Sequence, residues 1–282
     1  MLRIGLIGVG NVGRQFARLL REAGYPLTVM DTDPSKLESA LALGAQPADT
    51  PGEVADSSDI ILLSLPGSPA VEAVMEGPQG ILHHLREGQL VVDTGTSRPE
   101  TDLHYEQACR QKGAGFLDAP ITGRAKGWII MVGGAAEDYQ KARPVLACLA
   151  YKLERIGPIG QGQLLKLMNQ MMQAGQLAIQ AETIAFAENA GLDPRLLRDY
   201  LEFPISEGML AGEFSGGGHL ALHYKDLGYA LEVAHQTGAH TPLTSLIREV
   251  FKAVKLAGEP HWLQIAIVTY WRRLSSRPGE RG

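Results

Sequence analysis

A glycine-rich turn near the start of the chain constrains the fold more than any other feature. The apolar run Leu2–Ile7 ends at the hexapeptide GVGNVG of positions 8–13, and a helical pattern follows. A strand, a GxGxxG turn and a helix, in this order, are typical of a dinucleotide-binding unit. Gly8 permits the tight turn, Gly10 lets the backbone approach a pyrophosphate, and Gly13 lets the helix pack closely on the strand.

The helix that starts at this turn and the acidic residue downstream predict the cofactor. Asn11 and Val12 open the helix, where N–H groups and a partial positive charge suit phosphate groups. Asp31 ends the strand Leu27–Met30, 18 positions after Gly13. A carboxylate there can accept hydrogen bonds from a ribose and repels a 2′-phosphate, and no Arg lies beside it. NAD is therefore the expected cofactor, with NADP possible. The alternative is that Asp31 is an ordinary turn residue.

Strands and helices alternate through the N-terminal half. We expect helices at 35–43, 69–75, 99–112 and 136–149, and strands at 59–63, 89–92, 116–118, 128–134 and 152–156. Such alternation predicts an α/β, doubly wound, mostly parallel sheet. Ligands of these sheets bind beyond the carboxyl ends of the strands, so Leu65, Pro66 and Thr96 are candidates to line the cofactor. Each could equally be a plain loop residue.

A second candidate binding element follows the strand at 116–118. We expect a proline-stiffened loop from Ala119 to Arg124, ending in a hydroxyl, a glycine and a cation. Backbone N–H groups at Thr122 and Gly123, together with the Thr122 hydroxyl and a nearby Lys or Arg, would suit a carboxylate.

A long helix then joins the two halves of the chain. From Gln163 about 28 residues run without proline, and apolar side chains lie nearly all round the predicted helix, which favours burial, for example between two domains. Lys166, Asn169, Gln170 and Gln173 share one face. A lysine on a buried polar stripe has a lowered pKa and is suited to proton transfer. The alternative is a lysine that reaches solvent from a helix end.

The C-terminal half reads as all-helical, with helices at 195–201, 220–237, 242–257 and 261–274. Lys225, beside Asp226, could be a second lysine in the site, or the two residues could form a solvated surface pair of little consequence. His219 and His223 have the spacing of a helical metal pair, but a third ligand is missing from the pattern, so we predict no metal site. The expected domains are 1–160 and 161–274, with a flexible tail at 275–282.

Composition excludes several classes of function. The net charge of −5 argues against a nucleic-acid partner. The two cysteines form no disulfide framework or metal motif, and no apolar run reaches the length of a membrane span. The first residues lack a signal-peptide pattern, so the expected location is cytoplasmic.

Several motifs, in this order, resemble the β-hydroxyacid dehydrogenases, which include 3-hydroxyisobutyrate dehydrogenase, tartronate semialdehyde reductase and, more distantly, 6-phosphogluconate dehydrogenase. The motifs, which span roughly residues 1–260, are GLIGVGNVG, DTGT, FLDAPITG, MVGG, GPIGQGQLLKLMNQ and YKDL. The resemblance implies a Rossmann domain, a helical domain and a long helix bridging them.

The resemblance also implies roles for individual residues. Lys166 would be the catalytic acid/base, and Asn169 a substrate-binding residue. Gln170 stands where many relatives have a second Asn. Thr122 and Gly123 would hold the substrate carboxylate, and Lys225 and Thr96 would lie near the nicotinamide.

The chain departs from the family pattern in three places. Arg124 replaces a glycine, where it could add a contact to an anion or point to solvent. The segment 124–128 looks about three residues shorter than usual. An acidic residue that relatives tend to carry near His261 and Trp262 is missing.

We therefore expect an NAD(P)-dependent dehydrogenase that interconverts a small 3-hydroxy acid and its semialdehyde, as a homodimer or homotetramer. Two alternatives remain open: an imine reductase-like enzyme, which generally lacks the lysine, and a non-catalytic NAD-binding protein on the same scaffold.

Overall fold

The computed structural model describes residues 1–216 and 219–275, apart from the side chain of Arg124. It divides into two units, Met1–Lys166 and Leu167–Gly282. The first unit is built on one sheet with the strand order β3-β2-β1-β4-β5-β6-β8-β7, and β9 pairs with β8. The strands are β1 (Ile4–Ile7), β2 (Leu27–Met30), β3 (Gln46–Pro47), β4 (Ile60–Leu63), β5 (Leu90–Asp93), β6 (Gly115–Asp118), β7 (Ile121–Arg124), β8 (Gly127–Gly133) and β9 (Lys152–Gly157).

The sheet is parallel from β3 to β6, and β8 runs antiparallel to both β6 and β7. The doubly wound, mostly parallel architecture is thus confirmed. Between β1 and β4 the strand order reverses, which is where such sheets bind dinucleotides.

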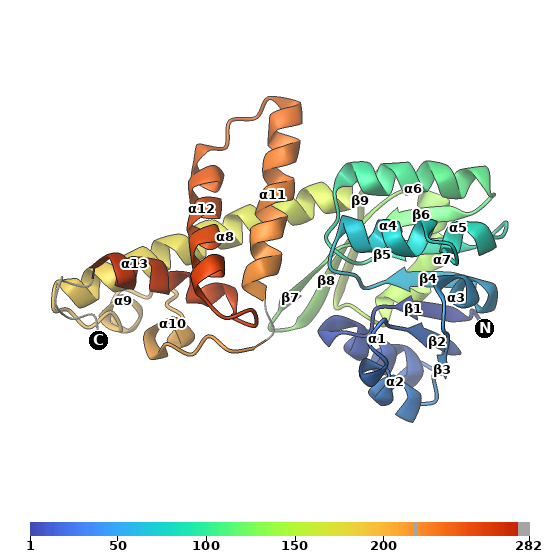
Figure 1. Ribbon diagram of the computed structural model, residues 1–282, viewed down its shortest axis with the longest axis horizontal. Coiled ribbons are helices and arrows are strands. Elements are labelled where there is room, and N and C mark those ends of the chain that lie inside the picture. Colours follow the sequence, from blue (N-terminus) through green and yellow to red (C-terminus); the bar gives the residue numbers. More distant parts are fainter. Residues whose placement is uncertain (217–218, 276–282) are drawn as a thin grey trace. The chain divides into compact units, whose positions relative to one another are not determined.

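Helices cover both faces of this sheet (Figure 1). They are α1 (Asn11–Glu22), η1 (Pro34–Lys36), α2 (Glu38–Ala42), α3 (Pro51–Ser57), α4 (Ser68–Glu76), α5 (Ile81–His84), α6 (Pro99–Gln111) and α7 (Ala136–Ala147). The local sequence determines where several of these helices begin. Proline occupies the first turn of α3, α4 and α6, and the Thr50 side chain caps α3 by accepting a bond from the Glu53 N–H at 3.2 Å.

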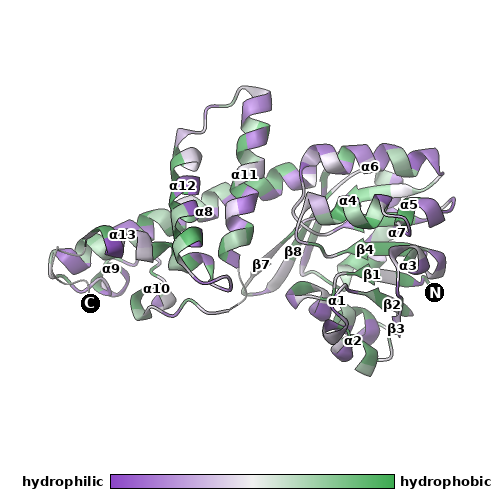
Figure 2. Ribbon diagram, in the orientation of Figure 1, coloured by the Kyte–Doolittle hydropathy of each residue, from purple (hydrophilic) through white to green (hydrophobic). Residues whose placement is uncertain are grey.

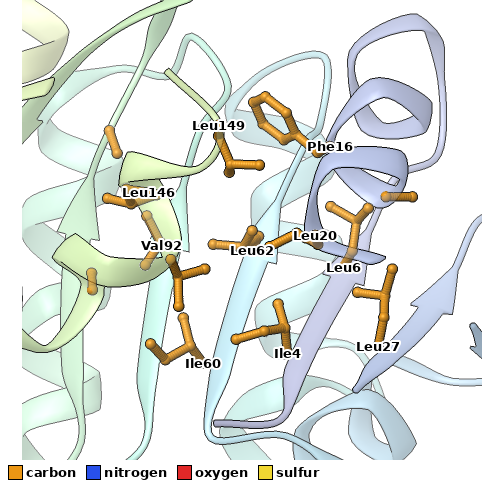
Figure 3. Close-up of a cluster of buried hydrophobic side chains, with 14 of the residues drawn as sticks. Ile4, Leu6, Phe16, Leu20, Leu27, Ile60, Leu62, Val92, Leu146 and Leu149 are labelled. Carbon is orange, nitrogen blue, oxygen red and sulfur yellow. The ribbon is translucent and has the colours of Figure 1, made fainter. Parts of the chain in front are cut away.

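Alternate residues of the central strands build two separate cores. Ile4, Leu62 and Val92 face the cluster that contains Phe16 and Leu20 of α1 (Figure 3). Their neighbours Ile7, Ile61, Leu63 and Val91 face the opposite cluster, with Tyr105 and Cys109 of α6. Because both faces are buried, these strands are hydrophobic throughout, as the green of β4 shows (Figure 2).

The structure corrects several element boundaries. The helix expected at 35–43 is broken into η1 and α2, because Asp33 and Pro34 start a short 3₁₀ turn instead. The predicted loop 119–124 ends in a strand, β7, which pairs with β8. The elements β3, α3 and α5 were not predicted.

The second unit contains helices throughout. Its helices are the main part of α8 (Gln161–Asn189), α9 (Leu196–Asp199), α10 (Glu207–Ala211), α11 (His219–Thr237), α12 (Pro242–Ala257), η2 (Gln264–Ile267) and α13 (Val268–Ser275). Ala174, Ala181 and Ile184 of α8 pack with Leu227 of α11 and Phe251 of α12. The helix expected at 261–274 is instead η2 followed by α13, and α10 was not predicted.

The long helix α8 differs from expectation in its burial. Its small residues face the core, but Met168, Met172, Ile179 and Phe186 are exposed, and Phe186 reaches 73%. The prediction of burial on all sides was therefore wrong for the chain taken alone. Residues 276–282 of the predicted tail lie outside the described residues. In the part of the chain that the structure describes, no helix is long and apolar enough to cross a membrane.

Candidate functional site

The glycine turn follows β1 and meets the loop after β4. Gly8 has a φ of +92°, and a side chain there would lie against the Ser64 carbonyl oxygen. A side chain on Gly13 would lie against the Gly8 carbonyl oxygen, so the close approach of α1 to the turn requires glycine. A Cβ on Gly10, in contrast, would meet nothing within 4 Å. The open space at Gly10 fits the approach of a pyrophosphate.

The first turn of α1 suits an anion. The helix starts at Asn11 without a side-chain cap bond or an acidic residue in its first turn. The Asn11 Oδ1 accepts a bond from the Arg14 Nη2 at 2.9 Å, whereas Val12 packs partly buried against the core. The N-terminal partial charge of α1 is therefore not offset by a carboxylate in the first turn of the helix itself. These residues fit a bound dinucleotide.

Asp31 lies beside the glycine turn. Its Oδ2 accepts the Val9 backbone N–H at 2.8 Å and its Oδ1 that of Asp33 at 2.9 Å. The side chain is 8% exposed, and the Lys36 Nζ lies 3.5 Å from Oδ1. The sequence did not predict a role for Lys36, because the short 3₁₀ turn η1 is what brings this lysine next to Asp31.

Two further loops reach the same edge of the sheet. Leu65 and Pro66 follow β4, and Thr96 follows β5. A Cβ on Gly95 would lie 2.6 Å from the Leu65 carbonyl oxygen, so the two loops touch. The structure therefore gathers the predicted cofactor-lining residues of the first unit at the carboxyl ends of β1, β2, β4 and β5.

The expected carboxylate-binding residues lie on the edge strand β7. Thr122 pairs with Ile129 and Gly123 with Trp128, and a Cβ on Gly123 would lie 3.0 Å from the Trp128 ring. Thr122 is buried and Gly123 is exposed. Arg124 ends the strand, and its side chain lies outside the described part of the structure.

Lys166 lies in the second turn of α8 and is buried, with 8% of its surface exposed. The start of this helix is fixed by Asp118 of β6. The Asp118 carboxylate accepts the Gly160 N–H at 2.7 Å and the Gln163 N–H at 2.8 Å. Burial raises the pKa of Asp118 to about 6, although these two bonds act to lower it.

Gln163, one turn before Lys166, ties α8 to the loop after β5. Its Oε1 accepts the Ser97 N–H and its Nε2 donates to the Gly95 carbonyl oxygen, both at 3.2 Å. Sequence reasoning assigned no role to Asp118 or Gln163. The available signal was the position of Asp118 at the end of a predicted strand.

In the second unit, Asn169, Gln170 and Lys225 belong to one polar network. The Gln170 Nε2 donates to the Asp226 Oδ2 at 2.6 Å, and its Oε1 accepts from the Asn169 Nδ2 at 3.2 Å. Lys225 pairs with the buried Asp226 at 3.1 Å and lies over the Tyr229 ring. The pair is therefore not a solvated surface pair. Both ends of the Gln170 amide are engaged, which suits it to orienting Asn169.

His223 is part of the packing of the second unit. It is buried, its Nε2 lies 3.0 Å from the Gln170 carbonyl oxygen, and its ring stacks on Phe251. Among the described residues, no group of three or more His, Cys, Asp or Glu could hold a metal ion.

Sequence and structure comparisons identify the family of this chain. Residues 3–157 match the family described as the NAD binding domain of 6-phosphogluconate dehydrogenase. Residues 160–271 match the family described as NAD-binding of NADP-dependent 3-hydroxyisobutyrate dehydrogenase. The 3-hydroxyisobutyrate dehydrogenase of Pseudomonas aeruginosa is 31% identical, over 93% of this chain and 95% of its own length.

Solved structures show the same fold. The Mycobacterium tuberculosis 3-hydroxyisobutyrate dehydrogenase with L-serine superposes with a TM-score of 0.86 at 27% identity, covering 96% of this chain and 99% of that one. The imine reductase of Myxococcus stipitatus with NADP+ has a TM-score of 0.64 at 22% identity over 96% and 99% of the two chains, which shows the fold alone. The chain belongs to the family of NAD(P)-binding 3-hydroxyisobutyrate dehydrogenases and related hydroxyacid dehydrogenases.

Proposed function

We propose that this protein interconverts a small 3-hydroxy acid and its semialdehyde, with NAD as the preferred cofactor and Lys166 as the acid/base. The observation that carries the proposal is the buried lysine on α8, three and four residues before Asn169 and Gln170, in a chain of this family. One relative is named for 3-hydroxyisobutyrate and another is described with L-serine. Both compounds are small carboxylates with a 3-hydroxyl group.

The cofactor, when bound, accepts or supplies the hydride. In oxidation the neutral Lys166 amine takes the proton of the substrate hydroxyl, and in reduction the ammonium returns a proton to the carbonyl oxygen. The base role requires a pKa well below the ordinary value of about 10.4, which burial of the side chain favours.

Other residues would hold the substrate in place. We assign carboxylate binding to Thr122 and Gly123, with Arg124 as a further candidate contact to the anion. Asn169 orients the hydroxyl group, and its own amide is steadied by Gln173 at 3.3 Å and by Gln170. Lys225, held by Asp226, contributes positive charge near the nicotinamide. Fixing both the carboxylate and the hydroxyl aligns the carbon for hydride transfer.

The preference for NAD rests on Asp31. Its buried carboxylate beside the glycine turn can accept bonds from the ribose hydroxyls and repels a 2′-phosphate. Lys36 offsets part of that charge, so we expect a preference for NAD and not exclusion of NADP.

The substrate class is tested by following NADH formation from NAD+ with a panel of 3-hydroxy acids, their methyl esters and the matching 2-hydroxy acids. We expect turnover with at least one 3-hydroxy acid, and a loss of at least about tenfold with its ester, because the ester lacks the charge that Thr122 and Gly123 would bind. Equal rates with acid and ester would contradict the proposed carboxylate site.

We also propose that a second copy of this chain packs on the exposed side of α8. Met172, Ile179 and Phe186 are spaced by seven residues, as in the contact seam of paired helices. Of the twenty-one exposed large apolar side chains in the described part of the chain, fourteen belong to the second unit, the smaller of the two. Apolar patches of this kind mark association surfaces.

A further inference from the structure

Three buried carboxyl groups meet inside the first unit. Asp93 ends β5 and Asp118 ends β6, and the parallel register places these two residues directly opposite each other. Like Val91 and Phe116, two positions earlier on the strands, they face the side of the sheet that α6 covers. Asp102 lies on the buried face of α6, three residues before Tyr105 and seven before Cys109. All three aspartates are 0% exposed.

Two of these carboxyl groups have hydrogen-bond donors that suit a negative charge. Asp93 accepts bonds from the Ser97 hydroxyl at 2.6 Å and from the Gly95 N–H at 2.8 Å. Asp118 accepts the two backbone N–H groups at the start of α8, where the helix dipole also favours an anion. Of the three buried acids, Asp93 and Asp118 are therefore the ones suited to carry a negative charge.

Asp102 differs from both. Neither of its carboxyl oxygens has a donor in good hydrogen-bond geometry among the described residues, although the Gln163 and Asp93 side chains lie close enough to act on it. A fully buried carboxylate without donors, facing two other carboxylates, is costly, and a neutral acid avoids that cost. Burial first, and then the charges of Asp93 and Asp118, raise the pKa of Asp102 well above its ordinary range, while Gln163 opposes them.

The three acids lie where α8 meets the loop after β5. Asp93 shapes that loop through Gly95 and Ser97, Asp118 caps α8, and Gln163 bonds the helix to the loop. The helix also packs so closely that a Cβ on Gly162 would lie 2.6 Å from the Asp118 Oδ2. A change in charge or shape within the acid group would therefore move both the loop with Thr96 and the helix with Lys166.

We propose that Asp102 is a positioning residue: its neutral carboxyl group completes a buried acid group with Asp93 and Asp118 that holds the first turn of α8, and with it Lys166, against the loop Gly95–Ser97. The inference rests on the proposed function only for the role of Lys166. The groups that act on Asp102 are Asp93 of β5, Asp118 of β6 and Gln163 of α8. Ionisation of Asp102 would place a third negative charge among them.

The protonation of Asp102 can be tested without any turnover. In Asp102→Asn the amide has the shape of the neutral acid and cannot ionise. We expect the infrared carbonyl band of a protonated carboxylic acid in the wild type at pH 8, and its loss in Asp102→Asn. A wild-type spectrum without that band would overturn the inference.

Equilibrium unfolding gives a second measurement of the same proton. In the unfolded chain Asp102 ionises near its ordinary pKa of about 3.9, so the wild type gains a proton on folding above that pH. The unfolding constant of the wild type relative to Asp102→Asn should rise with pH above the ordinary Asp pKa, by up to about tenfold per pH unit as long as Asp102 stays protonated in the folded protein. Parallel curves for the two proteins would contradict a neutral Asp102.

The positioning role is tested by the kinetics of Gln163→Ala and Asp102→Ala. We expect kcat to fall between about tenfold and a hundredfold and the Kd for NADH to change much less, because the glycine turn and Asp31 are untouched while Lys166 and the loop with Thr96 are displaced. Asp102→Asn should restore most of the kcat lost in Asp102→Ala.

A matched control for Gln163 is available just before β5. Gln89 precedes β5 and is also a buried amide that joins two segments, donating to the Ala55 and Ser58 carbonyl oxygens at 2.6 and 2.7 Å. Gln89→Ala should lower the melting temperature and leave kcat within about threefold. Equal losses of kcat in Gln89→Ala and Gln163→Ala would reduce Gln163 to a general stabilising residue and overturn the positioning claim. If the wild type shows no hydroxyacid turnover, the proposed function fails, while the infrared and unfolding experiments still decide the state of Asp102.

Discussion

At the residue scale, Asp31 is the side chain on which we propose that cofactor choice depends. It lies 2.8 Å from the Val9 N–H inside the glycine turn, so its charge faces the place where the adenosine ribose is expected. Lys36, at 3.5 Å and half exposed, is the nearby cation that would meet a 2′-phosphate once the carboxylate is removed.

We predict that Asp31→Ser shifts the ratio of kcat/KM for NADPH to that for NADH upward by about tenfold to a hundredfold, since two like charges at such a site repel by roughly 1–4 kcal/mol. Asp33→Ser is the control, because the Asp33 carboxylate caps η1 by accepting the Ser35 N–H at 3.1 Å. Equal shifts in the two variants would remove Asp31 from the cofactor site.

The sequence was most informative where one residue type is required for a local reason. The roles of Gly8 and Gly13 could be predicted because each avoids a clash within the turn, and in the structure a Cβ at either position would lie against a backbone carbonyl oxygen. Asp102 and Gln163 could not be assigned in the same way, because their partners come from strands and helices distant in sequence. Only the strand register, which the sequence does not state, brings Asp93 and Asp118 together.

At the scale of elements, the first turn of α8 packs so closely on the sheet that it has no space for an added side chain at Gly162. A Cβ on Gly162 would press on the Met131 carbonyl oxygen and on Asp118. We predict that Gly162→Ala destabilises the protein by about 1–3 kcal/mol and lowers kcat, because the first turn of α8 must shift. Urea unfolding and steady-state kinetics measure the two effects.

Gly175 is the matched control within the same helix. A Cβ there would meet nothing within 4 Å. Because Gly175 lies between Met172 and Ile179 on the side of α8 proposed to contact a second copy, the comparison is made in the Ile179→Glu, Phe186→Glu background, where Gly175→Ala should stabilise the protein by roughly 0.5–1 kcal/mol through the higher helix propensity of alanine. If Gly175→Ala lost as much stability as Gly162→Ala, α8 would tolerate alanine at neither position. The contact with Asp118 would then not be the cause of the destabilisation in Gly162→Ala.

Elements with strong local signals were predicted closely, and those that depend on distant pairing were not. The strand Leu27–Met30 and the helix Pro242–Ala257 have the predicted bounds, because an apolar run and an initial proline mark them. Strand β7 was predicted as a loop, since its strand character comes from pairing with β8. Helix α8 was predicted in length, but the exposure of its apolar side depends on packing partners.

The exposed stripe of α8 gives a prediction about assembly. Ile179→Glu with Phe186→Glu should convert a dimer or tetramer into a smaller species, because buried charges oppose association. Leu103→Glu, at an exposed leucine of α6, should leave the assembly unchanged. Light scattering after size-exclusion chromatography measures the mass, and an unchanged mass in the double variant would contradict the proposed interface.

For the whole molecule, the buried acids set the dependence of stability on pH. Asp118, with a pKa of about 6, and Asp102 bind protons in the folded state that the unfolded chain releases. Their contribution is fully present below the ordinary Asp pKa of about 3.9 and is lost as the pH rises through the folded values. The pKa of Asp59 is lowered by Arg3, so its contribution is lost on acidification instead.

We therefore predict that the melting temperature falls from pH 5 to pH 8 and also falls below about pH 4. Differential scanning calorimetry across this range checks the prediction. A melting temperature that rises steadily from pH 5 to pH 8 would show that the buried acids are ionised in the folded protein.

The measurement that tests the central claim most directly is the loss of NADH absorbance with a panel of small semialdehydes, in the wild type and in Lys166→Ala. Lys252→Ala, an exposed lysine paired with Glu249, is the control. The account predicts NADH consumption with at least one semialdehyde, a loss of at least about a hundredfold in Lys166→Ala with NADH still bound, and no change in Lys252→Ala. Near-wild-type turnover in Lys166→Ala would contradict the role of Lys166. If the wild type consumed no NADH with any semialdehyde of the panel, the proposed reaction would be contradicted.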